Sequence, residues 1–231
     1  MVIIATTENY KNIIRQEMSK LQTHAKLSVF TSLKTNPDGS KVRECYECTN
    51  FMNLLRIYEQ NSNGKLEVEE LSISENQEFA RRYDIQRVPT ILFIDDNGKE
   101  LVRYLAAPQG LEIQPFVKTI FAFADGPNYY ENAIKQNLHR INPTTIKIMM
   151  TNQCPYCPQL IETANLFAIA SEGKIRSVIV DILANQDIGQ YYKASGVPYT
   201  IINERPAIQG MIGPQHLLRE LIGSNTNIQY R

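Results

Sequence analysis

Two segments of the chain share one arrangement of cysteines, Cys45-Tyr46-Glu47-Cys48 and Cys154-Pro155-Tyr156-Cys157. They contain all four cysteines of the 231-residue sequence. A secreted scaffold usually spreads its cysteines so that disulfides close long loops, whereas close pairs are typical of redox or metal sites. The two pairs therefore indicate where the chemistry of the chain lies, and the segments around them decide the fold.

The two cysteine pairs belong to an internal repeat. Three sets of landmarks are separated by the same 109 residues: Cys45 and Cys154, Tyr83 and Tyr192, and Val88-Pro89 and Val197-Pro198. In each half, the proline follows the first cysteine by 44 residues. Three coincidences at one offset indicate the duplication of a unit.

The starts of the two halves match at a larger offset. The segment Tyr10–Gln16 resembles Tyr130–Gln136, which lies 120 residues further on. The first half therefore carries about eleven extra residues before its cysteines, and we assign them to the polar stretch Thr35–Glu44 because it contains a turn signal. We place the domain boundary near the loop-like segment Ala124–Asn128, which lies between two apolar-periodic segments and gives domains 1–124 and 125–231.

Each half is predicted to alternate helices with strands and to end in a hairpin and a helix. In the first half, helices are expected near 13–21, 51–58, 76–83 and 111–123, and strands at 27–30, 66–73, 90–94 and 101–104. In the second half, helices are expected at 129–141, 157–170, 187–192 and 216–222, and strands at 146–150, 177–182, 199–203 and 207–211. This order predicts an α/β fold in which each half has a central mixed sheet flanked by helices.

Each cysteine pair is expected where a strand ends and a helix begins. The first cysteine would lie near the N-cap and the second one turn later, close enough for the two sulfurs to form a disulfide. Unpaired backbone N–H groups and the positive end of the helix would stabilise a thiolate on the first sulfur. The thiolate is the species that attacks a disulfide, so this placement indicates thiol–disulfide exchange.

Three residues between the cysteines are expected to tune the two sites. Pro155 suits the first helical position, where its missing N–H is not needed, and Tyr156 completes that pair. Glu47 adds a negative charge beside the first prospective thiolate, which should raise the pKa of the thiol. We therefore predict that the Cys45–Cys48 site is the more reducing of the two.

The arrangement of these motifs resembles the thioredoxin fold. A strand, a Cys-x-x-Cys at a helix start, and Val-Pro-Thr or Val-Pro-Tyr before a final hairpin occur in both halves. The pair at Cys154–Cys157 resembles the glutaredoxin active site. Two such units, covering nearly the whole chain, look like the protein disulfide oxidoreductases, or glutaredoxin-like proteins, of thermophilic archaea and bacteria.

The resemblance implies a fold of two tandem thioredoxin-like domains and an enzyme that exchanges disulfides with protein substrates. Cys45 and Cys154 would be exposed nucleophiles, and Cys48 and Cys157 would be buried resolving thiols. The Val88-Pro89 and Val197-Pro198 bonds would be cis, and the backbone of each valine would pair with an extended substrate segment. The chain would bind no cofactor, and a separate flavoprotein of the thioredoxin reductase type would supply electrons.

Composition and charge argue against several other classes of function. The 24 basic and 24 acidic residues cancel, so no basic field is available for nucleic acid or an anionic membrane. No run approaches the ~18 apolar residues of a membrane-spanning helix. The first residues lack the basic segment and long apolar stretch of a signal peptide, so a cytoplasmic location is the expectation.

The four cysteines are also compatible with two alternative functions. Two pairs could supply four thiolates to a zinc ion in a redox-regulated or zinc-dependent binding module, although the 109-residue spacing disfavours a shared site. Within redox chemistry, the chain could instead be a dedicated electron carrier to a peroxiredoxin-type peroxidase. Asp181 ends an apolar strand and could accept a proton from Cys157, but Ser72 occupies the equivalent position, which favours an ordinary strand-end acid.

Overall fold

The first half of the chain builds four strands of a mixed sheet. β1 (Ala25–Thr31) pairs in parallel with β4 (Leu66–Ser72) and antiparallel with β5 (Thr90–Ile94). β5 also pairs antiparallel with β6 (Glu100–Leu105), and a tight turn joins these two strands. The half therefore has the strand order β4-β1-β5-β6.

The second half repeats this order with strands of similar length. β7 (Thr144–Met150) pairs in parallel with β8 (Ile175–Asp181) and antiparallel with β9 (Tyr199–Ile202). β10 (Arg205–Gln209) pairs antiparallel with β9, so the order is β8-β7-β9-β10. The repeat predicted from the cysteine and proline spacing is thus also a repeat of topology.

The two four-stranded units join into a single eight-stranded sheet. In the computed structural model, which describes residues 8–223, β6 pairs in parallel with β8, with Val102 opposite Ser177 and Leu105 opposite Val180. Each unit would otherwise expose an edge strand there, and the pairing satisfies the backbone groups of both. The sequence predicted a separate sheet for each half, and this junction is a feature that it did not indicate.

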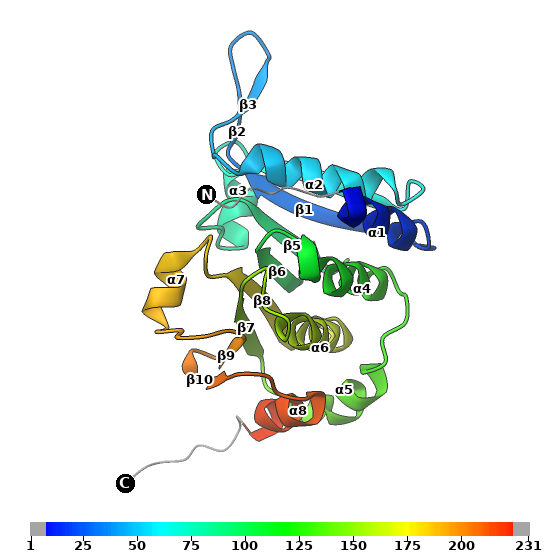
Figure 1. The fold of residues 1–231 in the computed structure, drawn as a ribbon, viewed down its shortest axis with the longest axis vertical. Coiled ribbons are helices and arrows are strands. Elements are labelled where there is room, and N and C mark those ends of the chain that lie inside the picture. Colours follow the sequence, from blue (N-terminus) through cyan, green and yellow to red (C-terminus); the bar gives the residue numbers. More distant parts are fainter. Residues whose placement is uncertain (1–7, 224–231) are drawn as a thin grey trace.

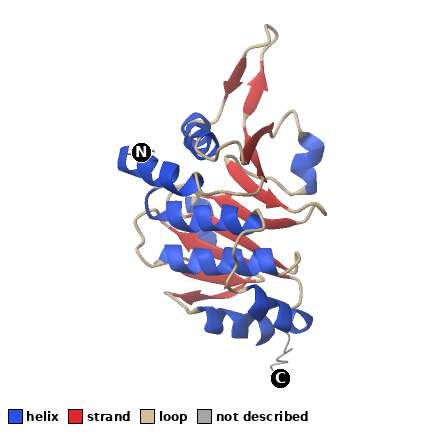
Figure 2. Cartoon of the chain, turned by 90° about the vertical axis from the view of Figure 1, so that its right-hand side faces the viewer, coloured by secondary structure: helices blue, strands red, loops and turns tan. Residues whose placement is uncertain are grey.

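Helices cover both faces of the sheet (Figures 1 and 2). One face carries most of them: α1 (Glu8–Met18), α2 (Cys48–Gln60), α4 (Ile113–Phe123), α5 (Glu131–Asn137), α6 (Cys157–Ala170) and α8 (Pro214–Gly223). The opposite face carries the short helices α3 (Gln77–Arg82) and α7 (Gln186–Tyr191). Two 3₁₀ turns, η1 (Gly110–Glu112) and η2 (Leu138–Arg140), precede α4 and follow α5.

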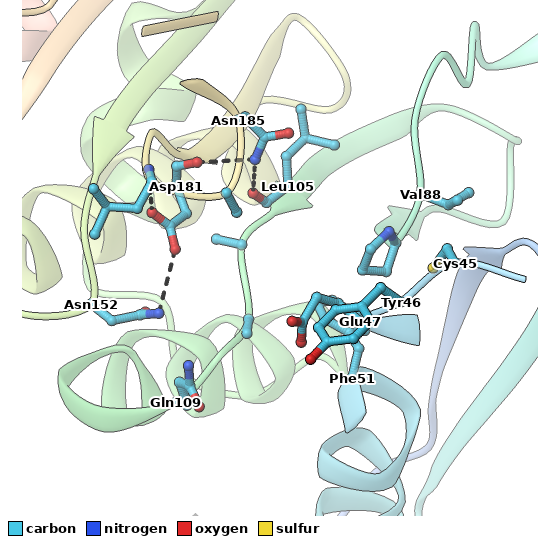
Figure 3. Close-up of a pocket in the computed structure, with 15 residues that line it drawn as sticks. Cys45, Tyr46, Glu47, Phe51, Val88, Leu105, Gln109, Asn152, Asp181 and Asn185 are labelled. Carbon is cyan, nitrogen blue, oxygen red and sulfur yellow. Dashed lines mark hydrogen bonds between the residues drawn. The ribbon is translucent and has the colours of Figure 1, made fainter. Parts of the chain in front are cut away.

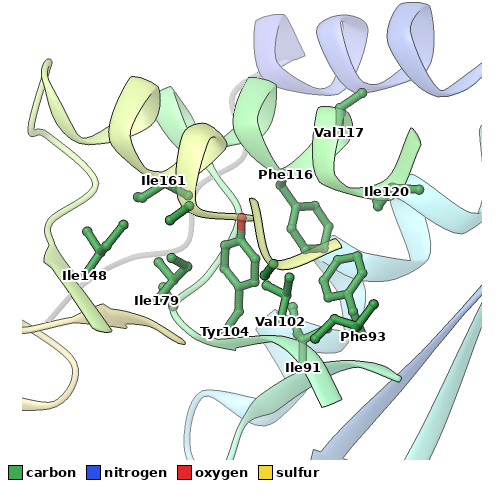
Figure 4. Close-up of a cluster of buried hydrophobic side chains, with 14 of the residues drawn as sticks. Ile91, Phe93, Val102, Tyr104, Phe116, Val117, Ile120, Ile148, Ile161 and Ile179 are labelled. Carbon is green, nitrogen blue, oxygen red and sulfur yellow. The ribbon is translucent and has the colours of Figure 1, made fainter. Parts of the chain in front are cut away.

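Alternation along the strands divides the apolar residues between these two faces. Ile91 and Phe93 of β5 face the helix-rich side, whereas Leu92 between them packs with the smaller cluster that includes Ala80 and Tyr83 of the α3 segment. The large cluster is continuous across the two halves, as Figure 4 shows for Phe93 and Ile179. The chain therefore has one main core in place of one for each half.

A buried polar network ties the two halves together within this core. The Asn165 side chain, which is fully buried on α6, donates to the Tyr104 hydroxyl at 2.7 Å and to Thr119 Oγ1 at 2.9 Å. Its carbonyl oxygen accepts from Ser177 Oγ at 2.7 Å. Tyr104 and Thr119 belong to the first half, so one side chain links β6, α4 and β8.

Asn165→Ala is expected to destabilise the chain by about 2–4 kcal/mol, because it removes the partner of the buried Tyr104 and Ser177 hydroxyl groups and opens a cavity. Urea denaturation measures the change in unfolding free energy. Asn132→Ala on the exposed side of α5 is the matched control and should change that free energy by less than about 0.5 kcal/mol. Equal effects of the two substitutions would contradict a structural role for the network.

The order of predicted elements is confirmed, with one addition. The polar insertion expected as a loop forms a projecting hairpin of β2 (Leu33–Thr35) and β3 (Lys41–Arg43), seen at the top of Figure 1. Arg43 anchors it to β4 through two 2.7 Å bonds to the Glu70 carboxylate.

Three sequence-based expectations concern the ends and limits of the fold. The division at residues 124 and 125 falls between α4 and α5 and stays a prediction. Residues 1–7, where the sequence predicts no signal peptide, lie outside the described range. None of the helices between residues 8 and 223 has the length and apolar character needed to span a membrane.

Candidate active sites

Both cysteine pairs form disulfides at the start of a helix. The Cα–Cα distance is 5.4 Å for Cys45–Cys48 and 5.5 Å for Cys154–Cys157. The helices begin at the second cysteines, with Glu47 and Tyr156 as N-caps, so the first cysteine lies further outside the helix than expected. The prediction that Pro155 holds the first helical position is wrong, because this residue precedes the N-cap.

The four cysteines differ in their exposure to solvent. Cys48 and Cys157 are fully buried, as expected for resolving thiols, and Cys45 is half-buried. The expectation that Cys154 is exposed is wrong for this disulfide form, in which only 5% of the residue is accessible. The reason is a tight turn in which the Cys154 N–H bonds to the Thr151 carbonyl at 3.0 Å and the side chain joins the main core cluster.

Backbone hydrogen bonding distinguishes the two sites. The Cys157 N–H donates to Cys154 Sγ at 3.1 Å, a contact that would stabilise a thiolate there. At the first site, the Cys48 N–H bonds instead to the Cys45 carbonyl at 3.3 Å. The Glu47 oxygen Oε2 is buried beside that site without a hydrogen-bond partner. These differences favour the thiolate of Cys154 over that of Cys45.

Both predicted cis peptide bonds are confirmed: Val88-Pro89 and Val197-Pro198 are cis. Val88 and Pro89 line the same cavity as Cys45, although they are 40 or more residues away in the sequence. The pairing of Val88 and Val197 with an extended substrate segment stays a prediction.

The cavity beside Cys45 has a volume of about 390 Å³ and is lined by both halves of the chain (Figure 3). Cys45, Tyr46 and Glu47 form one side, and Asn152 and Asp181 form the opposite side. The cavity exists because β6 and β8 bring the two halves together. The sequence assigned each cysteine pair to its own domain and did not indicate a site with residues from both.

Asp181 also lines this cavity, on the side opposite Cys45. It ends β8 with 4% of the residue accessible, and burial raises the pKa of its carboxyl group. Its Oδ1 accepts from the Leu183 N–H at 2.9 Å, and its Oδ2 accepts from Asn152 Nδ2 at 3.4 Å. Asp181 therefore ends its strand, as the favoured interpretation expected, and it also lines the cavity that contains Cys45, which the sequence did not indicate.

Glu112 is a buried acid that the sequence did not single out. Only 1% of the residue is accessible, and neither carboxyl oxygen has a hydrogen-bond partner. Burial, and next the negative charge of Asp181, raise the pKa of Glu112 to about 8. Its position between Leu111 and Ile113, at the start of an apolar helix, was the available signal.

An exposed aromatic side chain accompanies each disulfide. Tyr46 is 80% accessible and Tyr156 is 64% accessible. Large aromatic residues exposed beside a reactive group are typical of surfaces that contact other proteins. The predicted tuning role of Glu47 and Tyr156 is compatible with their N-cap positions and stays a prediction, as does that of Pro155.

No group of three or more His, Cys, Asp or Glu side chains in residues 8–223 is arranged to hold a metal ion. The two cysteine pairs therefore do not meet to form the shared zinc site that four thiolates could supply.

Comparison with known proteins identifies the fold as thioredoxin-like. Residues 144–223 match the family model described as a thioredoxin domain. A protein disulfide oxidoreductase from Aeropyrum pernix K1 is similar over 97% of this chain and 94% of its own, with a TM-score of 0.81 and 23% identity. No curated protein matches the chain.

Two further solved structures are similar to this chain over most of its length. The NTD_N/C domain of the alkylhydroperoxide reductase AhpF from Enterococcus faecalis has a TM-score of 0.75 and 17% identity, over 94% of this chain and all of that one. Sso1120 from Sulfolobus solfataricus has a TM-score of 0.55 and 16% identity, over 87% and 99%. The chain thus has the tandem thioredoxin-like fold with a Cys-x-x-Cys disulfide in each half.

Proposed function

We propose that this chain catalyses dithiol–disulfide exchange on protein substrates, as a reductant, oxidant or isomerase. The observation that carries the proposal is that each half holds a Cys-x-x-Cys disulfide directly before a helix, with the second cysteine fully buried. The hydrogen bond from the Cys157 N–H to Cys154 Sγ and the cavity beside Cys45 support it. The similarity to the Aeropyrum pernix protein disulfide oxidoreductase is compatible with it.

In the reductive direction, the thiolate of Cys154 or Cys45 attacks one sulfur of a substrate disulfide. A mixed disulfide forms, and the other substrate sulfur leaves as a thiolate that takes a proton from water. The thiolate of Cys157 or Cys48 then attacks the mixed disulfide and releases the second substrate thiol. Two electrons pass to the substrate, and the chain is left with an intramolecular disulfide.

A separate electron donor must then reduce that disulfide. We propose a flavin-dependent protein of the thioredoxin reductase type as this partner, and we propose no cofactor bound to this chain. The similarity to a domain of alkylhydroperoxide reductase is compatible with a flavoprotein donor. A cytoplasmic location, which the sequence predicts, would place the reaction in a compartment that keeps thiols reduced.

Insulin reduction with dithiothreitol as the electron source tests the proposal. We expect the unmodified chain to accelerate insulin precipitation and Cys45→Ser/Cys154→Ser to leave only the rate of dithiothreitol alone. Zinc analysis of the purified chain runs alongside. About one zinc per chain without any acceleration would contradict the enzyme and favour a zinc-dependent binding module.

A second candidate function is electron delivery to a peroxidase, which the likeness to the alkylhydroperoxide reductase domain favours. Peroxide consumption by a peroxiredoxin, measured beside insulin reduction, separates the two functions. A dedicated carrier would support peroxide turnover and leave insulin intact. A general oxidoreductase would reduce insulin whether or not it supported the peroxidase.

A further inference from the structure

The cavity beside Cys45 contains more hydrogen-bond acceptors than the chain satisfies. Glu47 Oε2 and Asn152 Oδ1 are both shielded from solvent and have no hydrogen-bond partner. The Asp181 carboxylate accepts backbone N–H groups of its own loop, but the only side chain that donates to it among the described residues is Asn152, at a long 3.4 Å. Gln109, which also lines the cavity, is more than nine-tenths buried. Buried polar groups normally have partners, so this set indicates a missing donor.

The charge of the cavity identifies the donor. Glu47 and Asp181 bring two carboxylates, and none of the fifteen lining residues is Lys, Arg or His. The nearby cation Arg87 is engaged elsewhere, because it binds the Asp187 carboxylate at 3.0 and 2.9 Å and Asn185 Oδ1 at 3.2 Å. Buried carboxylates without a compensating charge are unfavourable, and a cation placed between them would remove this cost.

The shape of the cavity suits a long side chain with a charged end. The cavity has a volume of about 390 Å³, and part of its wall is formed by apolar residues such as Phe51, Ala106 and Leu183. Lysine and arginine pack their methylene groups along apolar surface while the charged group binds polar partners. In Figure 3 the Glu47 carboxylate points towards the space between Cys45 and Asp181, and Gln109 lies on the same side as Asn152 and Asp181.

We propose that this cavity binds an arginine or lysine side chain of the protein substrate, close to the substrate cysteine that exchanges with Cys45. Arginine is the better fit, because its five N–H donors can serve more of these acceptors than the three donors of lysine. The inference rests on the proposed function and specifies its substrate class for the first site. The cavity is lined by Cys45 and not by Cys154, so this recognition is proposed for the first site alone.

The chemical step itself is unchanged by this recognition. The Cys45 thiolate forms a new bond to one substrate sulfur, and the other sulfur leaves as a thiolate and takes a proton. The Cys48 thiolate then displaces the remaining substrate sulfur, so that two electrons leave the chain. The bound cation holds the substrate disulfide beside Cys45, which lines the same cavity.

Single-turnover reduction of disulfide-linked peptides tests the inference. The enzyme is the full chain with Cys154→Ser/Cys157→Ser, reduced beforehand and freed of reductant. The peptides are identical except for one residue, which is Arg, Leu or Glu and is scanned over the three positions on each side of the cysteine. At the best position, we expect the second-order rate constant for Arg to exceed that for Glu by on the order of tenfold.

Two substitutions test whether the cavity causes the preference. Asp181→Asn and Glu47→Gln should each reduce the Arg/Glu ratio towards one. The ratio within one variant is the readout, since Glu47→Gln also changes the surroundings of Cys45. Asp96→Asn is the matched control, because it removes the same charge from the exposed turn at the far end of β5, and it should keep the full ratio.

The outcomes separate this inference from the proposed function. Equal rates for all peptides, or a preference that survives both cavity substitutions, would overturn cationic recognition while exchange at Cys45 stands. Failure of the unmodified chain to reduce any peptide would overturn the proposed function and the inference with it. A preference for Glu would show that the cavity carries positive potential and would also contradict the inference.

Discussion

Cys154→Ser is expected to lower insulin reduction at least about tenfold, whereas Cys45→Ser should retain most of it. The Cys154 sulfur already accepts the Cys157 N–H at 3.1 Å, and this contact would favour its thiolate at neutral pH. Cys45 lacks the equivalent contact and has the Glu47 carboxylate beside it. The initial rate of insulin precipitation with dithiothreitol measures the effect.

Two controls make this comparison interpretable. Iodoacetamide alkylation of each reduced variant at several pH values should show the thiol of Cys154 titrating below that of Cys45. The Cα–Cα distances at the two sites are nearly equal, so a difference in rate is not expected from the spacing of the pairs. Full activity of Cys154→Ser together with loss in Cys45→Ser would reverse the assignment, and the cavity beside Cys45 would then mark the main site.

Glu112→Gln is expected to stabilise the chain, and the gain should grow with pH. The pKa of Glu112 is about 8 in the folded chain, whereas its ordinary value is 4.5. Between these values the unfolded chain releases a proton that the folded chain keeps, so the unfolding free energy falls as pH rises. The resulting loss of unfolding free energy approaches about 5 kcal/mol above pH 8. Glutamine does not ionise, so the substituted chain does not suffer this loss.

Urea denaturation between pH 5 and pH 9 measures this effect. The unmodified chain and Glu112→Gln should be closest in stability at the acidic end and furthest apart at the alkaline end. Glu78→Gln, at an exposed position on α3, is the matched control and should follow the unmodified chain at every pH. A constant difference across the range would show that Glu112 does not change its protonation on unfolding.

The order of elements could be predicted because apolar periodicity and turn residues are local signals. β5 and α6 begin and end at the residues that the pattern indicated. The projecting hairpin was missed because Leu33–Thr35 and Lys41–Arg43 are short and largely polar, and Arg43 is anchored by Glu70 on a distant strand. The junction between β6 and β8 was missed for the same reason, since nothing local in either strand specifies its partner.

The residues of the candidate sites also divide into those that local sequence signals predicted and those that only the folded chain brings together. The cysteines and the cis prolines followed from a repeat that is visible in one sequence. Gln109 and Asn152 have no such signal, because their proximity to Cys45 depends on how the halves join. The burial of Cys154 depends on a turn at Thr151 that the residue types do not specify.

The continuous sheet also determines how the two disulfides can cooperate. Linked domains usually move relative to each other unless a large apolar interface holds them. Here such motion would break the parallel ladder of β6 and β8 and divide a shared core. The two redox centres are therefore held at a fixed separation, without a hinge that could bring them together. Direct dithiol–disulfide exchange between the two sites of one chain would need their sulfurs to meet, and the rigid sheet opposes such an approach.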